Sequence, residues 1–140
     1  MDIFSAGPSA GYTLPFATDG NFSPADSTTY YFGEYVTTSA TAAPIWLPRA
    51  GTVKAVYMSV VVGGTLGTTE TSTLSFRLNN TTDTTITSVL TAAAARTDFS
   101  NSALAIAVAA GDYCSIKWVT PAWVTNPTTI ILSGVIFVAI

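Results

Sequence analysis

Apolar and polar side chains alternate along most of this chain, and a period of two is the pattern of a half-buried β-strand. The alternation is clearest at residues 74–79 and 114–118, where large apolar side chains take turns with polar ones. No helical period is long enough to form a stable helix. Strands are predicted at 30–32, 52–62, 74–79, 86–90, 104–109, 114–118 and 130–140. The pattern therefore predicts an all-β protein.

Turn-forming residues separate the predicted strands at short intervals. Residues 79–83 (NNTTD) predict the tip of a hairpin, and Ala110–Asp112 turns the chain between two strands. A longer loop runs from Pro121 to Pro127. About eight short strands in one domain indicate a β-sandwich or single jelly roll. We place this domain at residues 30–140.

The first 29 residues differ from the rest of the chain. They are rich in Ser, Thr, Gly, Pro and Ala, and single aromatic residues stand apart among them: Phe4, Tyr12, Phe16 and Phe22. Spaced aromatic anchors suit docking, because each buries much area for every residue that becomes ordered. We therefore predict that residues 1–29 form an extended N-terminal arm that binds a neighbouring subunit or another protein. A disordered tail is the alternative.

The last predicted strand is apolar on both of its faces. Its even-numbered positions begin with Ile130, and its odd-numbered positions include Ile131, Val135 and Phe137. A sandwich strand in a monomer should have one wet face, and an apolar outer face marks an interaction site. We therefore predict an oligomer with this strand near its symmetry axis and with Ile131, Val135 and Phe137 in the interface. Coverage of the strand by the chain's own arm is the alternative.

Charge is scarce and slightly negative. The chain has five Lys and Arg residues, eight Asp and Glu residues and a net charge of −3. The five cations are scattered singly, whereas a phosphate-binding surface needs them clustered, so nucleic acid is not an expected partner. An anionic membrane surface is disfavoured for the same reason. The apolar end, 130–140, is too short to span a bilayer, and Met1–Phe4 lacks the start of a signal peptide. We expect a soluble protein that is made in a reducing cytoplasm.

Residues that carry out catalysis or hold metals are largely missing. The chain has no His, which excludes nucleophilic catalysis by a Ser-His-Asp or Cys-His arrangement. Cys114 is the single cysteine, so it forms neither a disulfide within the chain nor a zinc site, and we predict that it is buried. Most of the acidic residues fall at turns, where Asp caps local backbone groups. We therefore predict no catalytic residue, no metal ligand and no cofactor, and we do not expect an enzyme.

Three tryptophans remain to be placed. Trp46, Trp118 and Trp123 could form a sugar-stacking surface of the kind that a receptor-binding module uses. Trp118 falls on the inward side of its predicted strand, which favours the core. Trp123 lies in the loop at 121–127 and is the candidate for a surface aromatic residue.

The order of motifs after residue 30 is similar to that of a known protein family. The segments concerned are Tyr30–Gly33, Ile45–Tyr57, Phe76–Asp83, Ala110–Tyr113, Pro121–Trp123 and Asn126–Pro127, followed by the apolar last strand. This order resembles the head decoration (cement) proteins of tailed phages, which have a trimeric jelly-roll fold. The resemblance implies a homotrimer in the virion, on the outer surface of the capsid. There it would stabilise contacts between major capsid proteins, and the arm with Phe4, Tyr12, Phe16 and Phe22 would be the part that binds the capsid.

A second function from another class stays open. Similar small jelly rolls form receptor-binding tips of phage tail fibres or baseplates. We expect such a tip to join a shaft or a long upstream domain, whereas only a short arm precedes residue 30 here. The arm therefore favours the decoration protein over the tip.

Overall fold

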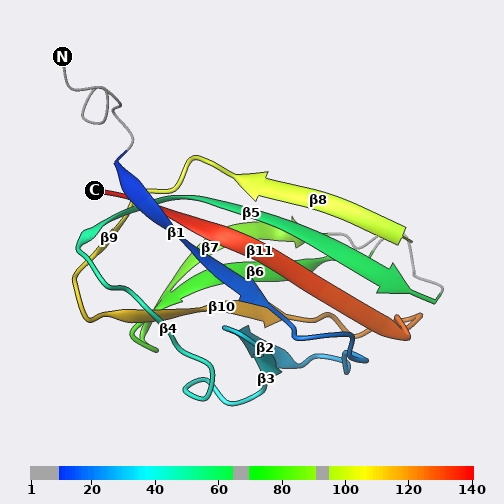
Figure 1. Ribbon diagram of the computed structural model, residues 1–140. Coiled ribbons are helices and arrows are strands. Elements are labelled where there is room, and N and C mark those ends of the chain that lie inside the picture. The colour runs from blue at the N-terminus through cyan, green and yellow to red at the C-terminus, as the bar shows by residue number, and fades with distance from the viewer. Residues whose placement is uncertain (1–9, 65–69, 91–94) are drawn as a thin grey trace.

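The computed structural model describes residues 10–64, 70–90 and 95–140. Within these ranges the chain forms eleven β-strands and no helix, which confirms the all-β prediction (Figure 1). The strands are β1 (Gly11–Ala17), β2 (Thr29–Phe32), β3 (Val36–Thr37), β4 (Ile45–Trp46), β5 (Gly51–Gly63), β6 (Ser72–Leu78), β7 (Thr82–Leu90), β8 (Ala95–Asn101), β9 (Ile106–Val108), β10 (Tyr113–Val119) and β11 (Thr129–Ala139).

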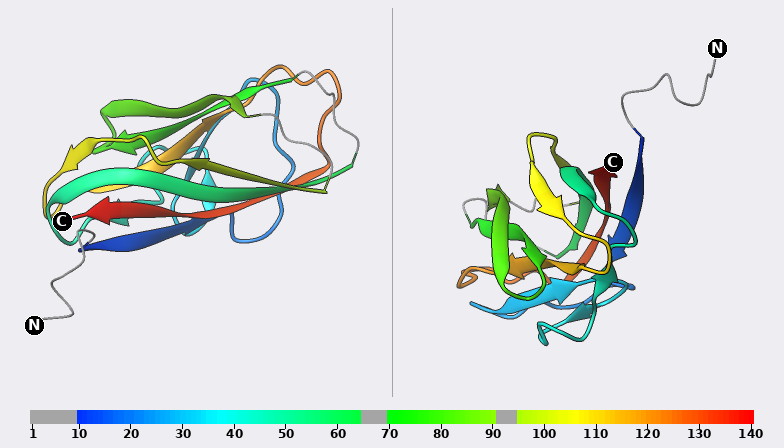
Figure 2. Two further views of the ribbon diagram at one scale, coloured as in Figure 1. Left: turned by 90° about the horizontal axis from the view of Figure 1, so that it is seen from above. Right: turned by 90° about the vertical axis from the view of Figure 1, so that its left-hand side faces the viewer.

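The strands form two antiparallel sheets that pack face to face, as the end-on view of Figure 2 shows. Sheet A has the order β1-β11-β5-β8, with the short β9 beside β5. Sheet B has the order β3-β2-β10-β6-β7, with the short β4 beside β10. The chain changes sheet between β1 and β2, β4 and β5, β5 and β6, β7 and β8, β9 and β10, and β10 and β11, whereas β2–β3–β4, β6–β7 and β8–β9 stay within one sheet. This repeated crossing is the connectivity of a jelly roll. The jelly-roll prediction is confirmed.

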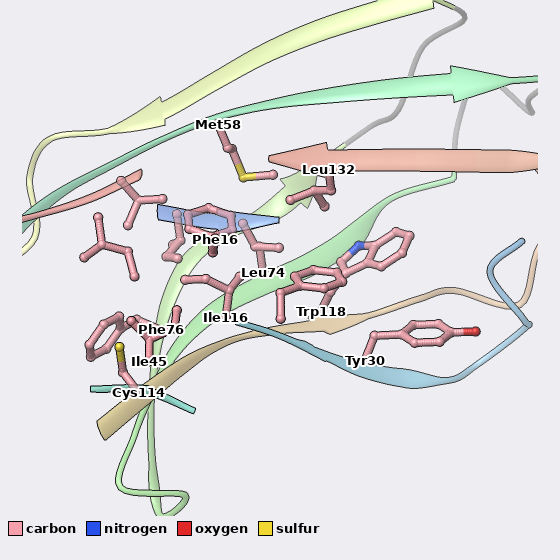
Figure 3. Close-up of a cluster of buried hydrophobic side chains, with 14 of the residues drawn as sticks. Phe16, Tyr30, Ile45, Met58, Leu74, Phe76, Cys114, Ile116, Trp118 and Leu132 are labelled. Atoms are coloured by element: carbon pink, nitrogen blue, oxygen red, sulfur yellow. The ribbon is translucent and has the colours of Figure 1, made fainter. Parts of the chain in front are cut away.

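The core lies between the sheets, and strand alternation fills it. On β11 the even-numbered residues point inward, so Ile130, Leu132, Ile136 and Val138 are fully buried. Side chains from the two sheets meet in Figure 3: Phe16, Met58 and Leu132 from sheet A, and Leu74, Phe76, Ile116 and Trp118 from sheet B.

The predicted hairpin tip is present between β6 and β7. Asn79 and Asn80 have positive φ angles of 50° and 54°, as a two-residue type I′ turn requires. The Thr81 amide then donates to the Leu78 carbonyl oxygen at 3.0 Å. The predicted turn at Ala110–Asp112 also forms, and Gly111 supplies its positive φ of 86°.

The prediction of an N-terminal arm is wrong for the described residues 10–29, because most of them belong to the domain. β1 pairs with β11 along its whole length, from Gly11 opposite Ala139 to Ala17 opposite Ser133. The chain therefore enters the jelly roll with β1, and the boundary between residues 29 and 30 does not exist as a domain boundary.

The aromatic residues assigned to capsid binding serve the chain's own core. Phe16 is 2% exposed, and its ring occupies space that Gly134 leaves open, because a Cβ at Gly134 would lie 2.7 Å from the Phe16 Cζ. The Phe22 ring packs against Tyr30 with centroids 5.1 Å apart. Tyr12 also packs against the core, and its hydroxyl donates to the Arg49 carbonyl oxygen at 2.6 Å. Phe4 lies outside the described residues.

Candidate functional site

An apolar surface covers the outer face of sheet A. It is formed by outward side chains of β5 and β11, which stand opposite one another in register: Val61 beside Ile131 and Tyr57 beside Val135. Tyr57 is 49% exposed, Ile131 is 40% exposed and Val61 is 38% exposed. We call Tyr57, Val61, Ile131, Val135 and Phe137 the apolar face. Large apolar side chains on neighbouring strands form a contiguous patch, which is a sign of an interaction surface.

The apolar face contains an open hollow of about 700 Å³. Ser59 and Ser133 are small, and they stand opposite each other between the Val61–Ile131 row and the Tyr57–Val135 row. Their size lowers the surface between two ridges, and Pro15 on β1 contributes to the wall of the hollow. Ridges with a hollow between them can interlock with side chains of another protein surface.

The charged residues of sheet A are Arg96 and Asp98 on its β8 edge and Lys54, which is exposed on β5 at the register shift beside Phe137. Arg96 donates to both carboxylate oxygens of Asp98, at 2.7 and 3.0 Å. These hydrogen bonds and the negative charge of Asp98 raise the pKa of Arg96. The two side chains are about two-thirds exposed, at 67% and 65%. The five residues of the apolar face carry no charge themselves, whereas the paired Arg96 and Asp98 stand beside Val61 and Ser59 and line the hollow.

The predicted interface residues come together on this face. Ile131, Val135 and Phe137 all point outward, as their odd-numbered positions predicted. The Phe137 ring also leans over Gly11, where a Cβ would lie 2.9 Å from its Cε2 atom. Part of Phe137 is thus packed within its own chain, and Ile131 is more accessible.

Sequence reasoning missed two of the five residues of the apolar face. Tyr57 and Val61 lie on the outward side of β5, between the buried positions Val56, Met58 and Val60. The same alternation that placed those residues inside could have placed Tyr57 and Val61 outside. Only the structure shows that β5 is the partner of β11, which brings the two apolar rows together.

The outer face of sheet B is polar. The Asp83 carboxylate lies 2.7 Å from both the Arg77 and the Lys117 side-chain nitrogens, one at each oxygen. The Arg77 guanidinium also lies over the Tyr31 ring, 5.9 Å from its centroid. Burial raises the pKa of Asp83, but hydrogen bonds from Lys117 and Arg77 and their positive charges outweigh it, and the pKa falls below its usual value. We call Tyr31, Arg77, Asp83 and Lys117 the charged cluster.

The tryptophans are arranged differently from the prediction. Trp123 is only 8% exposed, and its ring packs against Trp118 with centroids 6.5 Å apart, so its assignment to the surface is wrong. The loop that carries Trp123 folds back over the core, which the sequence of a loop does not reveal. Trp118 is in the core, as predicted, and its indole N–H donates to Ser72 Oγ at 2.6 Å. Trp46 is the exposed tryptophan, at 62%.

Cys114 is buried, as predicted. Desolvation raises the pKa of its thiol to about 12, so almost no thiolate is present at neutral pH. Among the residues that the structure describes, no three carboxylate or cysteine side chains gather where they could hold a metal ion together. The described ranges also contain no helix of the length and hydropathy needed to cross a membrane.

Comparisons with protein-family models, with curated proteins and with solved structures find no match to this chain. We therefore infer the function of the protein from the outer faces of its two sheets.

Proposed function

We propose that this protein is a structural virion component, a trimeric decoration protein on the head of a tailed phage. The observation that carries the proposal is the apolar face of sheet A, which joins exposed Tyr57, Val61 and Ile131 in one patch. The jelly roll and the order of its turns are those on which the resemblance to decoration proteins rests.

The chemistry of the apolar face supports self-association. Burying Val61 and Ile131 against another subunit removes apolar area from water, at about 25 cal/mol for each Å². The residues of the apolar face bring no charge of their own to be desolvated, and the neighbouring Arg96 and Asp98 on the edge strand are paired with each other. A small domain with little charge and one apolar outer face is well suited to a closed oligomer.

A trimer would hold its capsid contacts in a fixed arrangement. Three linked contacts raise avidity over a single one by about 10²–10⁴-fold when the geometry lets all three engage. The partner in this proposal is the major capsid protein. Tyr12, Phe16 and Phe22 are used within the domain, so we no longer assign them to that contact.

Light scattering tests the assembly. The purified protein should have about three times the chain mass of 14.5 kDa, and Ile131→Asp should reduce it to the mass of one chain. Val124→Asp is the matched control, because Val124 is 89% exposed in the loop before β11 and lies off the apolar face. A monomeric wild-type protein, or an Ile131→Asp trimer, would contradict the assignment of this face.

Cryo-electron microscopy of phage particles tests the location. Density for the jelly roll on the outside of the head supports the decoration role. Density at a fibre tip or baseplate instead supports the second candidate, a receptor-binding tip. The exposed Trp46 is the observation that keeps this candidate in view, because a solvent-facing aromatic ring suits ligand recognition.

A further inference from the structure

One end of sheet B's outer face carries an exposed aromatic pair. Trp46 on β4 stands opposite Tyr113 on β10, and both side chains point away from the core. Their ring centroids are 5.4 Å apart and their planes are inclined by 57°. The two rings thus present a tilted aromatic platform to solvent, which the self-association proposed for sheet A leaves uncovered.

Backbone hydrogen bonds fix the strand ends that carry the platform. The Leu47 amide donates to the Asp112 carbonyl oxygen at 2.8 Å, and the Gly111 amide donates to the Leu47 carbonyl oxygen at 2.9 Å. Tyr113 exchanges two bonds with Asn79, because its amide donates to Asn79 Oδ1 at 3.1 Å and its carbonyl oxygen accepts from the Asn79 amide at 2.8 Å. Both aromatic residues are therefore held in place before any ligand arrives.

The Asp112 side chain completes this support. Its carboxylate accepts from the Ala109 amide at 2.8 Å and from Asn79 Nδ2 at 3.1 Å. Because these hydrogen bonds favour the ionised carboxylate, they lower the pKa of Asp112 below its ordinary value. A preorganised platform binds with less loss of conformational entropy than a mobile one.

A row of polar groups continues from the platform along β10. Tyr113, Ser115 and Lys117 point to the same outer face, where Ser115 itself is buried, and Arg77 stands opposite Ser115. The Arg77 and Lys117 side chains are 18% and 23% exposed. Tyr113 and Lys117 are about 13 Å apart at the strand rise of about 3.3 Å per residue, the length of a short oligosaccharide. Arg77 also donates twice to Asn80, so two of its five N–H groups remain for a ligand, and Lys117 keeps two of its three.

We propose that this strip binds a short oligosaccharide, with a pyranose ring stacked on Trp46 and its neighbours reaching Arg77 and Lys117. Sugar rings present C–H groups to an aromatic face and hydroxyl groups to polar side chains, and the strip supplies both. Trp46 and Val119 are the large exposed apolar residues of this face among the described positions, and they lie at opposite ends of β10. One well-exposed Trp beside the half-buried Tyr113, with polar groups along the same face, suits a sugar better than it suits the broad apolar core of a protein interface.

A glycan array tests the proposal with the full-length protein. We expect wild-type protein to bind a group of related oligosaccharides, and Trp46→Ala to weaken binding to them at least tenfold. Trp46→Phe should retain part of the affinity, because it keeps an aromatic face. Tyr57→Ala is the matched control, since it removes an exposed aromatic ring from the opposite sheet and should bind as the wild type does.

Tryptophan fluorescence gives a second readout that needs no variant. Trp46 is exposed whereas Trp118 and Trp123 are buried, so iodide should quench mainly Trp46. A sugar bound on the platform should protect Trp46 from iodide. Failure of every glycan on the array to bind, equal binding by Trp46→Ala, or unchanged quenching with a bound glycan would each overturn the proposal. None of these results would alter the oligomeric state on which the proposed function depends.

Discussion

The two outer faces of the sandwich have opposite chemistry, although both back onto the same core. Sheet A presents Val61 and Ile131, and its charged residues are Arg96 and Asp98 on β8 and Lys54 at the start of β5. Sheet B presents Arg77, Asp83 and Lys117, which are joined by ion pairs of 2.7 Å. Strand alternation requires the inner faces to be apolar, but it leaves the outer faces free to differ. The difference between them therefore reflects what each face meets.

A face that stays in water gains from side chains that water solvates well. The charged cluster has that property, and the side chains of Arg77 and Lys117 keep contact with solvent, at 18% and 23% exposed. Exposure of the apolar face to water is unfavourable, and it lowers the solubility of the protein until another surface covers it. This contrast supports the proposal that sheet A meets other copies of the chain while sheet B stays open to smaller ligands.

The largest expected effect comes from placing the same charge on each face in turn. Val61 on sheet A and Val119 on sheet B are almost equally exposed, at 38% and 37%. Val61→Lys should dissociate the oligomer, because each subunit would bury an ammonium group at a cost of several kcal/mol. Val119→Lys should leave the oligomeric mass unchanged. Light scattering distinguishes the two, and a reversed result would move the interface to sheet B.

The next effect contrasts the two sides of β1. Phe16→Ala should lower the free energy of unfolding by about 3–5 kcal/mol, because it leaves a large cavity beside Gly134. Thr13→Ala, on the outward side of the same strand, should change it little. Urea unfolding followed by fluorescence measures both. Equal stabilities for Phe16→Ala and wild type would mean that β1 is not part of the folded domain.

The fold was predictable to the extent that each strand reveals itself locally. The alternation at β6 and β10 located both strands, and Asn79–Asn80 located the hairpin. The sequence pattern did not predict β8, because Arg96, Asp98 and Ser100 give this strand a polar outer side and only Phe99 is large and apolar. The sequence pattern did not predict β1 either, because Pro15 lies within it, although proline is tolerated on an edge strand such as β1.

The candidate site was predictable only in part, for a different reason. Ile131 and Val135 could be found from β11 alone, because the strand is apolar on both sides. Tyr57 joined them only through the pairing of β5 with β11, which is a contact between residues far apart in the sequence. The exposure of Trp46 and the burial of Trp123 depend on loop paths, which local sequence patterns do not encode.

A smaller effect is expected from the charged cluster. Asp83→Asn should lower the free energy of unfolding by about 1–2 kcal/mol, because Arg77 and Lys117 lose their shared acceptor and charge partner. Asp19→Asn removes the same charge from an exposed turn and serves as the control. Thermal or urea unfolding at neutral pH gives the comparison.

The pH dependence sharpens this test. The pKa of Asp83 in the folded protein lies below its ordinary value of 3.8. Its contribution is therefore complete above that value and is lost as the pH falls through the lower, folded pKa. The stability difference between wild type and Asp83→Asn should thus shrink in acid. A difference that stays constant down to the lowest pH at which the protein folds would show that the carboxylate charge does not matter.

The smallest effect is expected at the edge of the apolar face, from Arg96→Gln. Arg96 and Asp98 form an ion pair of good geometry, yet both side chains are mostly in water, where such pairs contribute little. We expect no measurable change in the unfolding midpoint at either low or high salt. The oligomeric mass should also stay the same, because rim charges affect the rate of association more than its strength. A loss of assembly in Arg96→Gln would extend the interface across β8 and would place the contact at the edge of sheet A rather than at its centre.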